Sequence, residues 1–219
     1  FSLILKSRFL ALTGLPEGRV LLHGGTDPRH GAQPVDIFDM ANNSITPGSR
    51  PANARRHHGH LGVRIGNSDN VLFAGGEFFD GAYRATDTAE LYNVGSGNFL
   101  PLLLRETRRG PAVVPLGDSQ VLIAGGNHDT PQDPNTPVHA RNSAEVIDLS
   151  SLQSRLLVPQ LTMPRAFPTP ISVDVDDDPQ GYIIGGIVYD GRTYEDQDII
   201  TPLTGMEFSA AGPPAWQEP

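Results

Sequence analysis

A short apolar run that ends in a pair of glycines occurs four times in this chain of 219 residues, and it constrains the fold more than any other feature. The first glycines of successive pairs are 51, 50 and 60 residues apart. A continuous apolar run of this length is typical of a strand buried on both faces. The glycines indicate a point where another backbone passes closely or where φ is positive. The four copies are Arg19-Val-Leu-Leu-His-Gly-Gly25, Asn70-Val-Leu-Phe-Ala-Gly-Gly76, Gln120-Val-Leu-Ile-Ala-Gly-Gly126 and Gly181-Tyr-Ile-Ile-Gly-Gly186.

The sequence around each glycine pair also repeats. An arginine that leads into a strand precedes each pair, at Arg8, Arg56, Arg109 and Arg165. A second short strand with alternating apolar and polar residues follows each pair, at Val35–Asp39, Ala89–Asn93, Ala144–Asp148 and Met206–Phe208. A turn and a large apolar residue come next, at Ile45, Phe99, Leu156 or Leu157, and Trp216. Each unit is therefore predicted to contain four strands, a to d, in the same order.

These residues resemble the kelch repeat, whose period is about 50 residues. Val71-Leu-Phe-Ala-Gly-Gly76, Thr88-Ala-Glu-Leu-Tyr-Asn93 and Gly97-Asn-Phe99 are especially similar to the bacterial form of the repeat. The resemblance implies an all-β fold, a β-propeller of four-stranded antiparallel kelch-type blades. A single domain over 1–219 would hold repeats at about 8–46, 56–99, 109–157 and 165–216. Two alternatives stay open: a closed four-bladed ring, or part of a larger propeller completed by another segment or by self-association.

Composition excludes several classes of function. The net charge of −9 argues against general nucleic-acid binding, which usually needs a basic face. No stretch approaches the roughly 18–20 apolar residues of a membrane helix. The chain has no cysteine, which rules out disulfides and cysteine-ligated metals. It also excludes the copper-radical oxidase activity known in kelch-type enzymes, because that site needs a cysteine crosslinked to tyrosine.

The resemblance implies that the d–a connections and the b–c connections project on one face and form the binding surface, and the candidates are taken from the b–c connections. These are expected at Thr26–Pro34, Glu77–Thr88, Asn127–Ser143 and Ile187–Leu203, and the last two are about 17 residues long, which favours a functional or mobile role. Their aromatic and polar side chains suit a sugar, a peptide or another polar ligand, against the alternative of solvated loops that merely connect strands. The candidates are Phe79, Tyr83, Arg84, His128, His139, Arg141, Tyr189, Arg192 and Tyr194.

The arginines that open strand a form a second candidate set. In a propeller, strand a lines the channel, so Arg8, Arg56, Arg109 and Arg165 are expected to form a ring near one mouth. Guanidinium groups bind carboxylate or phosphate in a planar, bidentate manner, which suits an anionic ligand. The alternative is structural, with each arginine paired to neighbouring carboxylates or carbonyls.

No metal site or cofactor is expected. His57 and His58 would point to opposite faces of a strand, so the cluster that they form with His60 is poorly placed around one ion. The acidic run from Asp174 lacks the glycine and glutamate that a calcium loop requires, since Pro179 and Gly185 occupy those places. It is interpreted as an acidic turn.

The expected function is a binding scaffold that presents its loop face to a protein, peptide or glycan. One alternative is a small-molecule enzyme, such as a sugar epimerase or lyase, which uses the same loops; no catalytic motif supports it. Another is a structural module of a larger surface protein. Fold alone does not decide among these. The resemblance and the missing initiator Met favour a secreted or surface location over the cytoplasm.

Overall fold

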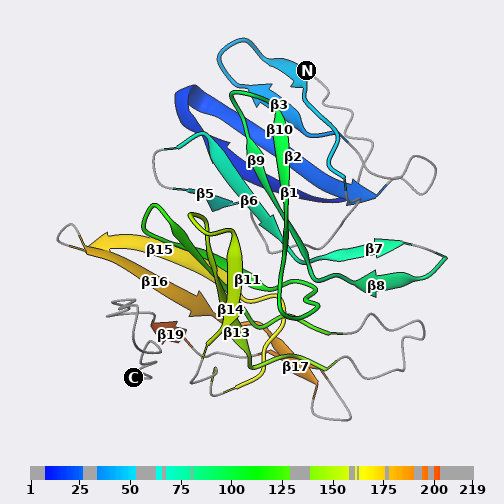
Figure 1. Cartoon of the computed structure of the whole chain (residues 1–219), viewed down its shortest axis with the longest axis vertical. Helices are drawn as coiled ribbons and strands as arrows, with labels where there is room; N and C mark the ends of the chain where they lie inside the picture. The colour runs from blue at the N-terminus through cyan, green and yellow to red at the C-terminus, as the bar shows by residue number, and fades with distance from the viewer. Residues whose placement is uncertain are drawn as a thin grey trace.

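The chain is all-β, and its sheets are antiparallel (Figure 1). The computed structural model describes residues 8–26, 34–52, 63–65, 68–79, 81–128, 139–157, 161, 163–175, 178–189, 194–196 and 200–202. Within these ranges, the only helical segment is the 3-10 turn η1 (Pro16–Gly18). In the described part of the chain no helix is long and apolar enough to cross a membrane.

Three sheets of four strands follow one another along the chain. The first contains β1 (Arg8–Leu15), β2 (Arg19–Thr26), β3 (Asp36–Asp39) and β4 (Ser44–Pro47), in that order. The second has the order β10-β9-β6-β5, from β5 (Val63–Arg64), β6 (Asn70–Ala74), β9 (Thr88–Asn93) and β10 (Asn98–Leu103). The third has β11 (Ala112–Leu116), β12 (Gln120–Ala124), β13 (Ala144–Asp148) and β14 (Gln153–Leu156).

The fourth sheet has three strands in the described residues, β15 (Thr169–Val175), β16 (Asp178–Ile184) and β19 (Ile200–Pro202). Sequence analysis places the third strand of this unit at Met206–Phe208, which lies outside the described residues. The strand that pairs with β16 is instead β19, inside the segment predicted as a loop. The predicted b–c connection of this unit therefore includes a strand of the sheet.

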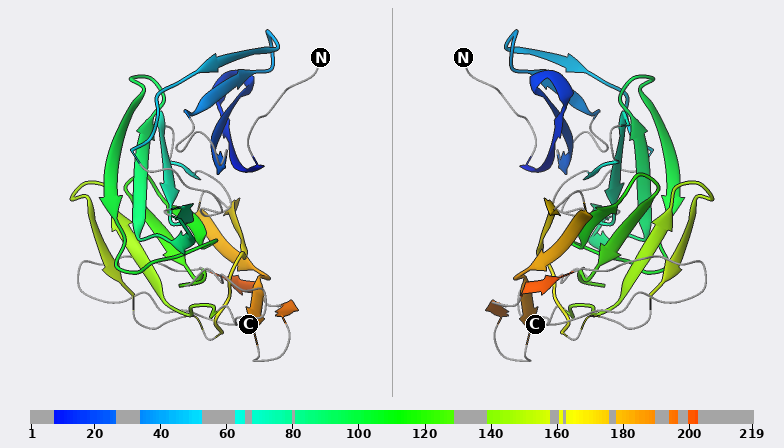
Figure 2. Two further views of the ribbon diagram at one scale, coloured as in Figure 1. Left: turned by 90° about the vertical axis from the view of Figure 1, so that its right-hand side faces the viewer. Right: turned by 90° about the vertical axis from the view of Figure 1, so that its left-hand side faces the viewer.

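The four sheets lie side by side in chain order, with their first strands together (Figure 2). β5 contacts β1 on one side and β11 on the other, and β11 also contacts β15. The fourth strands β10 and β14 meet at the opposite edge. No closed ring of sheets is present among the residues that the structure describes (Figure 2).

The core lies between the faces of successive sheets. Phe73 and Tyr92 of the second sheet pack against Leu21 of the first, while Leu72 on the other face of β6 packs toward Ile123 of the third. Every side chain from Val71 to Ala74 is at most 1% exposed. The prediction of strands buried on both faces is therefore confirmed for this apolar run, because each inner sheet is covered by a neighbour on each side.

The glycine pairs are points of close backbone approach between units. Gly75 has φ of +66°, and a Cβ on it would collide with the carbonyl oxygen of Arg108. The N–H of Gly76 donates to that same carbonyl at 2.7 Å. Gly125 and the N–H of Gly126 contact Arg165 in the same way. Both expectations for the glycines, positive φ and close approach, are confirmed at these two pairs.

Candidate binding site

The connections after the glycine pairs begin as two-stranded ribbons at one end of the sheets. In the second unit, Gly76 leads directly into a hairpin of β7 (Glu77–Phe79) and β8 (Tyr83–Ala85). In the fourth unit the ribbon is β17 (Ile187–Tyr189) with β18 (Tyr194–Asp196). β7, β8 and β17 extend from the same side of the molecule in Figure 1. These ribbons give the predicted loop candidates a defined backbone.

The tip of the β7–β8 hairpin carries an aromatic pair, of which Phe79 is exposed and Tyr83 is half-buried. Phe79 lies opposite Tyr83 in the register, and their ring centroids are 4.9 Å apart with planes inclined by 55°. Phe79 is 60% exposed, although it is a large apolar side chain. Arg84 lies opposite Phe78, on the other face of the ribbon, and is exposed. Aromatic and arginine side chains are those most enriched where proteins bind partners.

The root of the same hairpin is fixed by an ion pair to the next unit. Glu77 is fully buried, and its Oε2 lies 3.0 Å from Nε of Arg109. The Arg109 guanidinium carbon lies 5.1 Å from the ring centroid of Phe167, which precedes the first strand of the fourth sheet. One arginine thus connects the second, third and fourth units below the aromatic pair.

Arg108, rather than Arg109, occupies the structural position of Arg165. The carbonyl oxygens of Arg108 and Arg165 each accept the N–H of the second glycine in the preceding unit. Both side chains are fully buried. Arg109 corresponds instead to Ala166, since each makes an isolated bridge to the residue after a glycine pair. Sequence reasoning took the second of two adjacent arginines, because the spacing to the following strand does not distinguish them.

The Arg108 guanidinium makes a hydrogen bond with every one of its donors. Nε donates to Glu145 at 2.8 Å, and Nη1 donates to the carbonyls of Gly125 and Ser143 at 2.8 and 2.9 Å. Nη2 donates to Glu106 and to the Ser143 hydroxyl, both at 3.0 Å. Such an environment favours the structural role that was weighed against anion binding for the arginine set.

Arg141 also contacts Glu106, the carboxylate that pairs with Arg108. Its Nε donates to the carbonyl of Thr107 at 3.0 Å, and its Nη1 lies 3.3 Å from Oε2 of Glu106. Its backbone N–H donates to the carbonyl of Gly126. The Arg141 side chain is 23% exposed, so part of it is accessible to solvent. Its positive charge is paired with the Glu106 carboxylate.

His128 and His139 face each other across the ribbon of the third unit. Asn127 bridges Ala140, so the two histidines are the next opposed pair, and their ring centroids are 5.4 Å apart with planes within 4° of parallel. Both are exposed. Among the residues described, no group of three or more His, Cys, Asp or Glu is arranged to hold a metal ion.

The remaining candidates are placed in part. Arg8 begins β1 opposite Thr26, and Tyr189 pairs with Tyr194 at the tip of the β17–β18 ribbon. Arg56 and Arg192 lie outside the described residues, as do His57, His58 and His60. The structure thus brings Tyr83, His128 and Tyr194 to equivalent connections of successive units, all following the glycine pairs.

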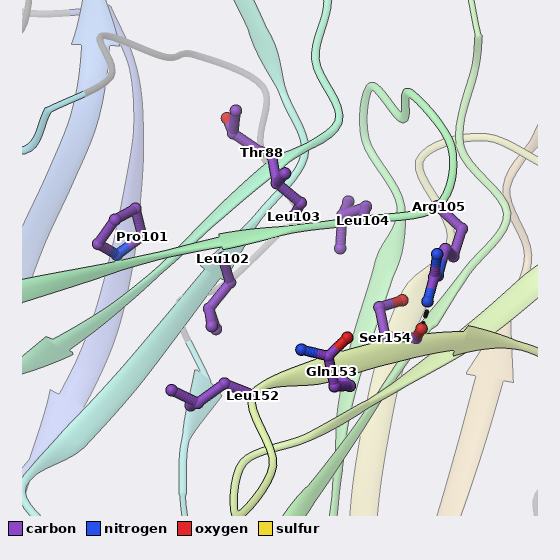
Figure 3. Close-up of a pocket in the computed structure, with 9 residues that line it drawn as sticks. All are labelled: Thr88, Pro101, Leu102, Leu103, Leu104, Arg105, Leu152, Gln153 and Ser154. Carbon is purple, nitrogen blue, oxygen red and sulfur yellow. Dashed lines mark hydrogen bonds between the residues drawn. The ribbon is translucent and has the colours of Figure 1, made fainter.

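A hollow of about 640 Å³ lies away from this loop end, between the fourth strands of the second and third sheets (Figure 3). Its lining is Thr88, Pro101, Leu102, Leu103, Leu104, Arg105, Leu152, Gln153 and Ser154. Sequence reasoning missed it. The available signal was the run Phe99-Leu-Pro-Leu-Leu-Leu104, in which apolar residues occupy both faces of an outer strand that needs only one apolar face.

No known family model matches the chain, and no curated protein matches it significantly.

Proposed function

We propose that this chain is a kelch-type β-propeller segment that binds a protein or peptide ligand through the connections that follow its glycine pairs. The propeller interpretation is supported by the repeated four-stranded sheets and by the contacts among their first strands. Radial packing of this kind leaves the connections at one end free to vary without changing the core.

The observation that carries the binding proposal is the Phe79–Tyr83 pair, an exposed phenylalanine against a half-buried tyrosine, on a hairpin with a fixed root. Phe79 is 60% exposed, so a partner that covered it would gain the free energy of burying a large aromatic side chain. The Glu77–Arg109 ion pair orders the backbone below the pair, so little conformational entropy is lost when a ligand binds. Arg84 adds a cation on the same hairpin.

A protein or peptide is favoured over a glycan by the geometry of the pair. The rings of Phe79 and Tyr83 are inclined by 55°, so they form a wedge rather than a flat platform for a sugar ring. Phenylalanine, tyrosine and arginine together are typical of the centres of protein interfaces.

The test is a selection with the immobilised chain against a displayed random peptide library, with a glycan array in parallel. Peptides that bind should lose at least about tenfold in affinity to F79A and Y83A, which corresponds to the truncation of an interface anchor. I45A is the matched control, because Ile45 is 41% exposed on β4, away from the hairpin. If the chain binds a glycan and Y83A abolishes that binding, the ligand is a sugar and the choice of a peptide ligand is wrong. Absence of both, or binding insensitive to both substitutions, would overturn the proposal.

A further inference from the structure

The hollow between β10 and β14 is a groove with an apolar floor and one charged end. We call it the outer groove and define it by Leu102, Leu152 and Arg105. Figure 3 shows Leu102 turned toward Leu152 from the facing unit, with Arg105 beyond them beside Ser154. Its volume of about 640 Å³ lies within the range of sites that hold small ligands or short peptide segments.

Leucines exposed along the groove are not needed for the core. Leu152 is 38% exposed, whereas Leu102 and Leu104 are buried. Leu103, on the opposite face of β10 from Leu102, is 68% exposed. Leu100 of β10 and Leu156 of β14 are 40% and 48% exposed. These two strands therefore present several large apolar side chains to solvent, as docking surfaces do.

Leu152 occupies a backbone position that disfavours leucine. Its φ is +59°, and it is the last turn residue before the fourth strand. The corresponding residues in the first and second units are Asn43 and Gly97, with φ of +49° and +73°. Asparagine and glycine tolerate this conformation, whereas leucine is strained by it. The third unit thus places an apolar side chain into the groove at a conformational cost.

Arg105 provides an oriented cation at the end of the groove. Its Nε donates to the carbonyl of Ser154 at 2.7 Å, and its backbone N–H donates to Glu145 at 2.7 Å. Within the part of the chain that the structure describes, its Nη1 and Nη2 make no hydrogen bond or ion pair. The nearby Glu145 carboxylate is already paired with Arg108 at 2.8 Å. Arg105 is therefore a positive charge open to a ligand, in a chain whose net charge is −9.

The groove also has strand edges on both sides. β10 and β14 are the terminal strands of their sheets, so each has one edge without a neighbouring strand in the described residues. Backbone groups at such an edge can pair with an extended segment.

From these observations we infer that the outer groove binds an extended peptide with an acidic residue between apolar residues. The apolar side chains would pack against Leu152 and against Leu102 on the floor of the groove. The acidic side chain would receive the paired N–H groups of Arg105, since a guanidinium binds a carboxylate in a bidentate manner. The inference rests on the groove alone and does not depend on the hairpin proposed as the primary binding surface.

The direct test is fluorescence anisotropy with the labelled peptide Ser-Val-Leu-Asp-Leu-Val-Ser and with the same peptide carrying Asn in place of Asp. We expect wild-type chain to bind the Asp peptide at least about tenfold more tightly than the Asn peptide, the effect of losing a charged hydrogen-bond pair. R105Q should remove that preference and leave the weak affinity for the Asn peptide unchanged. The preference should also decrease as salt is added.

L152G separates binding from folding. It removes the groove side chain and relieves the strain at φ +59°, so the thermal midpoint should stay the same or rise while the affinity for the Asp peptide falls. Y83A, on the hairpin, is the matched control and should bind the Asp peptide as wild type does. The inference is overturned if wild-type chain does not bind the Asp peptide, if R105Q and L152G bind it normally, or if Y83A abolishes binding. Self-association through the groove that excludes the peptide would overturn it as well.

Discussion

The guanidinium of Arg109 stacks over the ring of Phe167, with its central carbon 5.1 Å from the ring centroid. Phe167 has φ of +53°, and its N–H donates to the carbonyl of Gly110 at 2.8 Å. A Cβ at Gly110 would collide with the Phe167 ring. The residues before the first strands of the third and fourth sheets are thus packed against one another, and the same arginine reaches back to Glu77 at the root of the hairpin.

Breaking the Glu77–Arg109 ion pair should loosen the hairpin and destabilise the fold. E77Q leaves the Arg109 cation beside a buried amide, and removal of one partner from a buried pair costs about 3–5 kcal/mol. The value should fall toward the lower end, because the Arg109 side chain is 18% exposed. Urea unfolding measures the loss. E17Q is the control, because Glu17 is 83% exposed and its Oε2 lies as far as 3.9 Å from Nη2 of Arg19, so this surface ion pair should contribute little. Equal stability of E77Q and wild type would contradict the prediction.

Glycine pairs should be intolerant of alanine where a neighbouring unit approaches. G125A combines a positive φ of +67° with a collision against the Arg165 carbonyl, so we expect a loss of about 3 kcal/mol or more. Gly14 is the matched control, because it has no positive φ and nothing lies within 4 Å of a Cβ built there. G14A should be neutral or more stable by about 0.5–1 kcal/mol. Thermal denaturation of both variants measures the two stabilities. If G125A is as stable as G14A, the proposed packing of neighbouring units is wrong.

This packing shows what the sequence did and did not allow to be predicted. The periodicity of the glycine-pair strands predicted the four units, and β13 (Ala144–Asp148) coincides with the strand expected there. The register of the arginines could not be predicted, because Arg108 and Arg109 are adjacent and only the carbonyl contact to Gly76 distinguishes them. The outer groove was missed because it forms between β10 and β14, which belong to different units. A local sequence pattern does not show that these two strands contact each other. β19 was missed because its three residues lie in a segment without alternation.

Glu145 should be essential for stability, since it holds the segment that enters its own unit. It accepts the backbone N–H of Arg105 at 2.7 Å and Nε of Arg108 at 2.8 Å. E145Q removes the buried carboxylate from Nε of the fully buried Arg108 guanidinium and leaves Glu106 as its carboxylate partner, at a cost of about 3–5 kcal/mol. The double variant R108M/E145L should be less destabilised than the sum of the two single variants, because it removes both charges together. Additive losses in urea unfolding would contradict this coupling.

Acid should weaken the turns between the third and fourth strands. Hydrogen bonds from the backbone of Ser151 and then Ser150 lower the pKa of Asp148, and the side chain and backbone of Asn42 lower the pKa of Asp39. A carboxyl whose pKa is depressed by folding stabilises the native state above its unfolded pKa, and this stabilisation is lost as pH falls through the folded pKa. D39N/D148N should therefore lose less stability than wild type between pH 5 and about pH 2. Unfolding curves at several pH values test this, with D118N as the control for an acidic residue in another turn; identical pH profiles would refute it.

Ligand binding at the end that carries the β7–β8 hairpin is the central claim, and hydrogen–deuterium exchange with a peptide selected on the wild-type chain tests it most directly. We predict that saturating peptide slows exchange in Glu77–Phe79 and Tyr83–Ala85, and that this protection is lost in Y83A while the sheets exchange as before. Protection confined to the outer groove, or no protection of the hairpin at saturation, would contradict the claim.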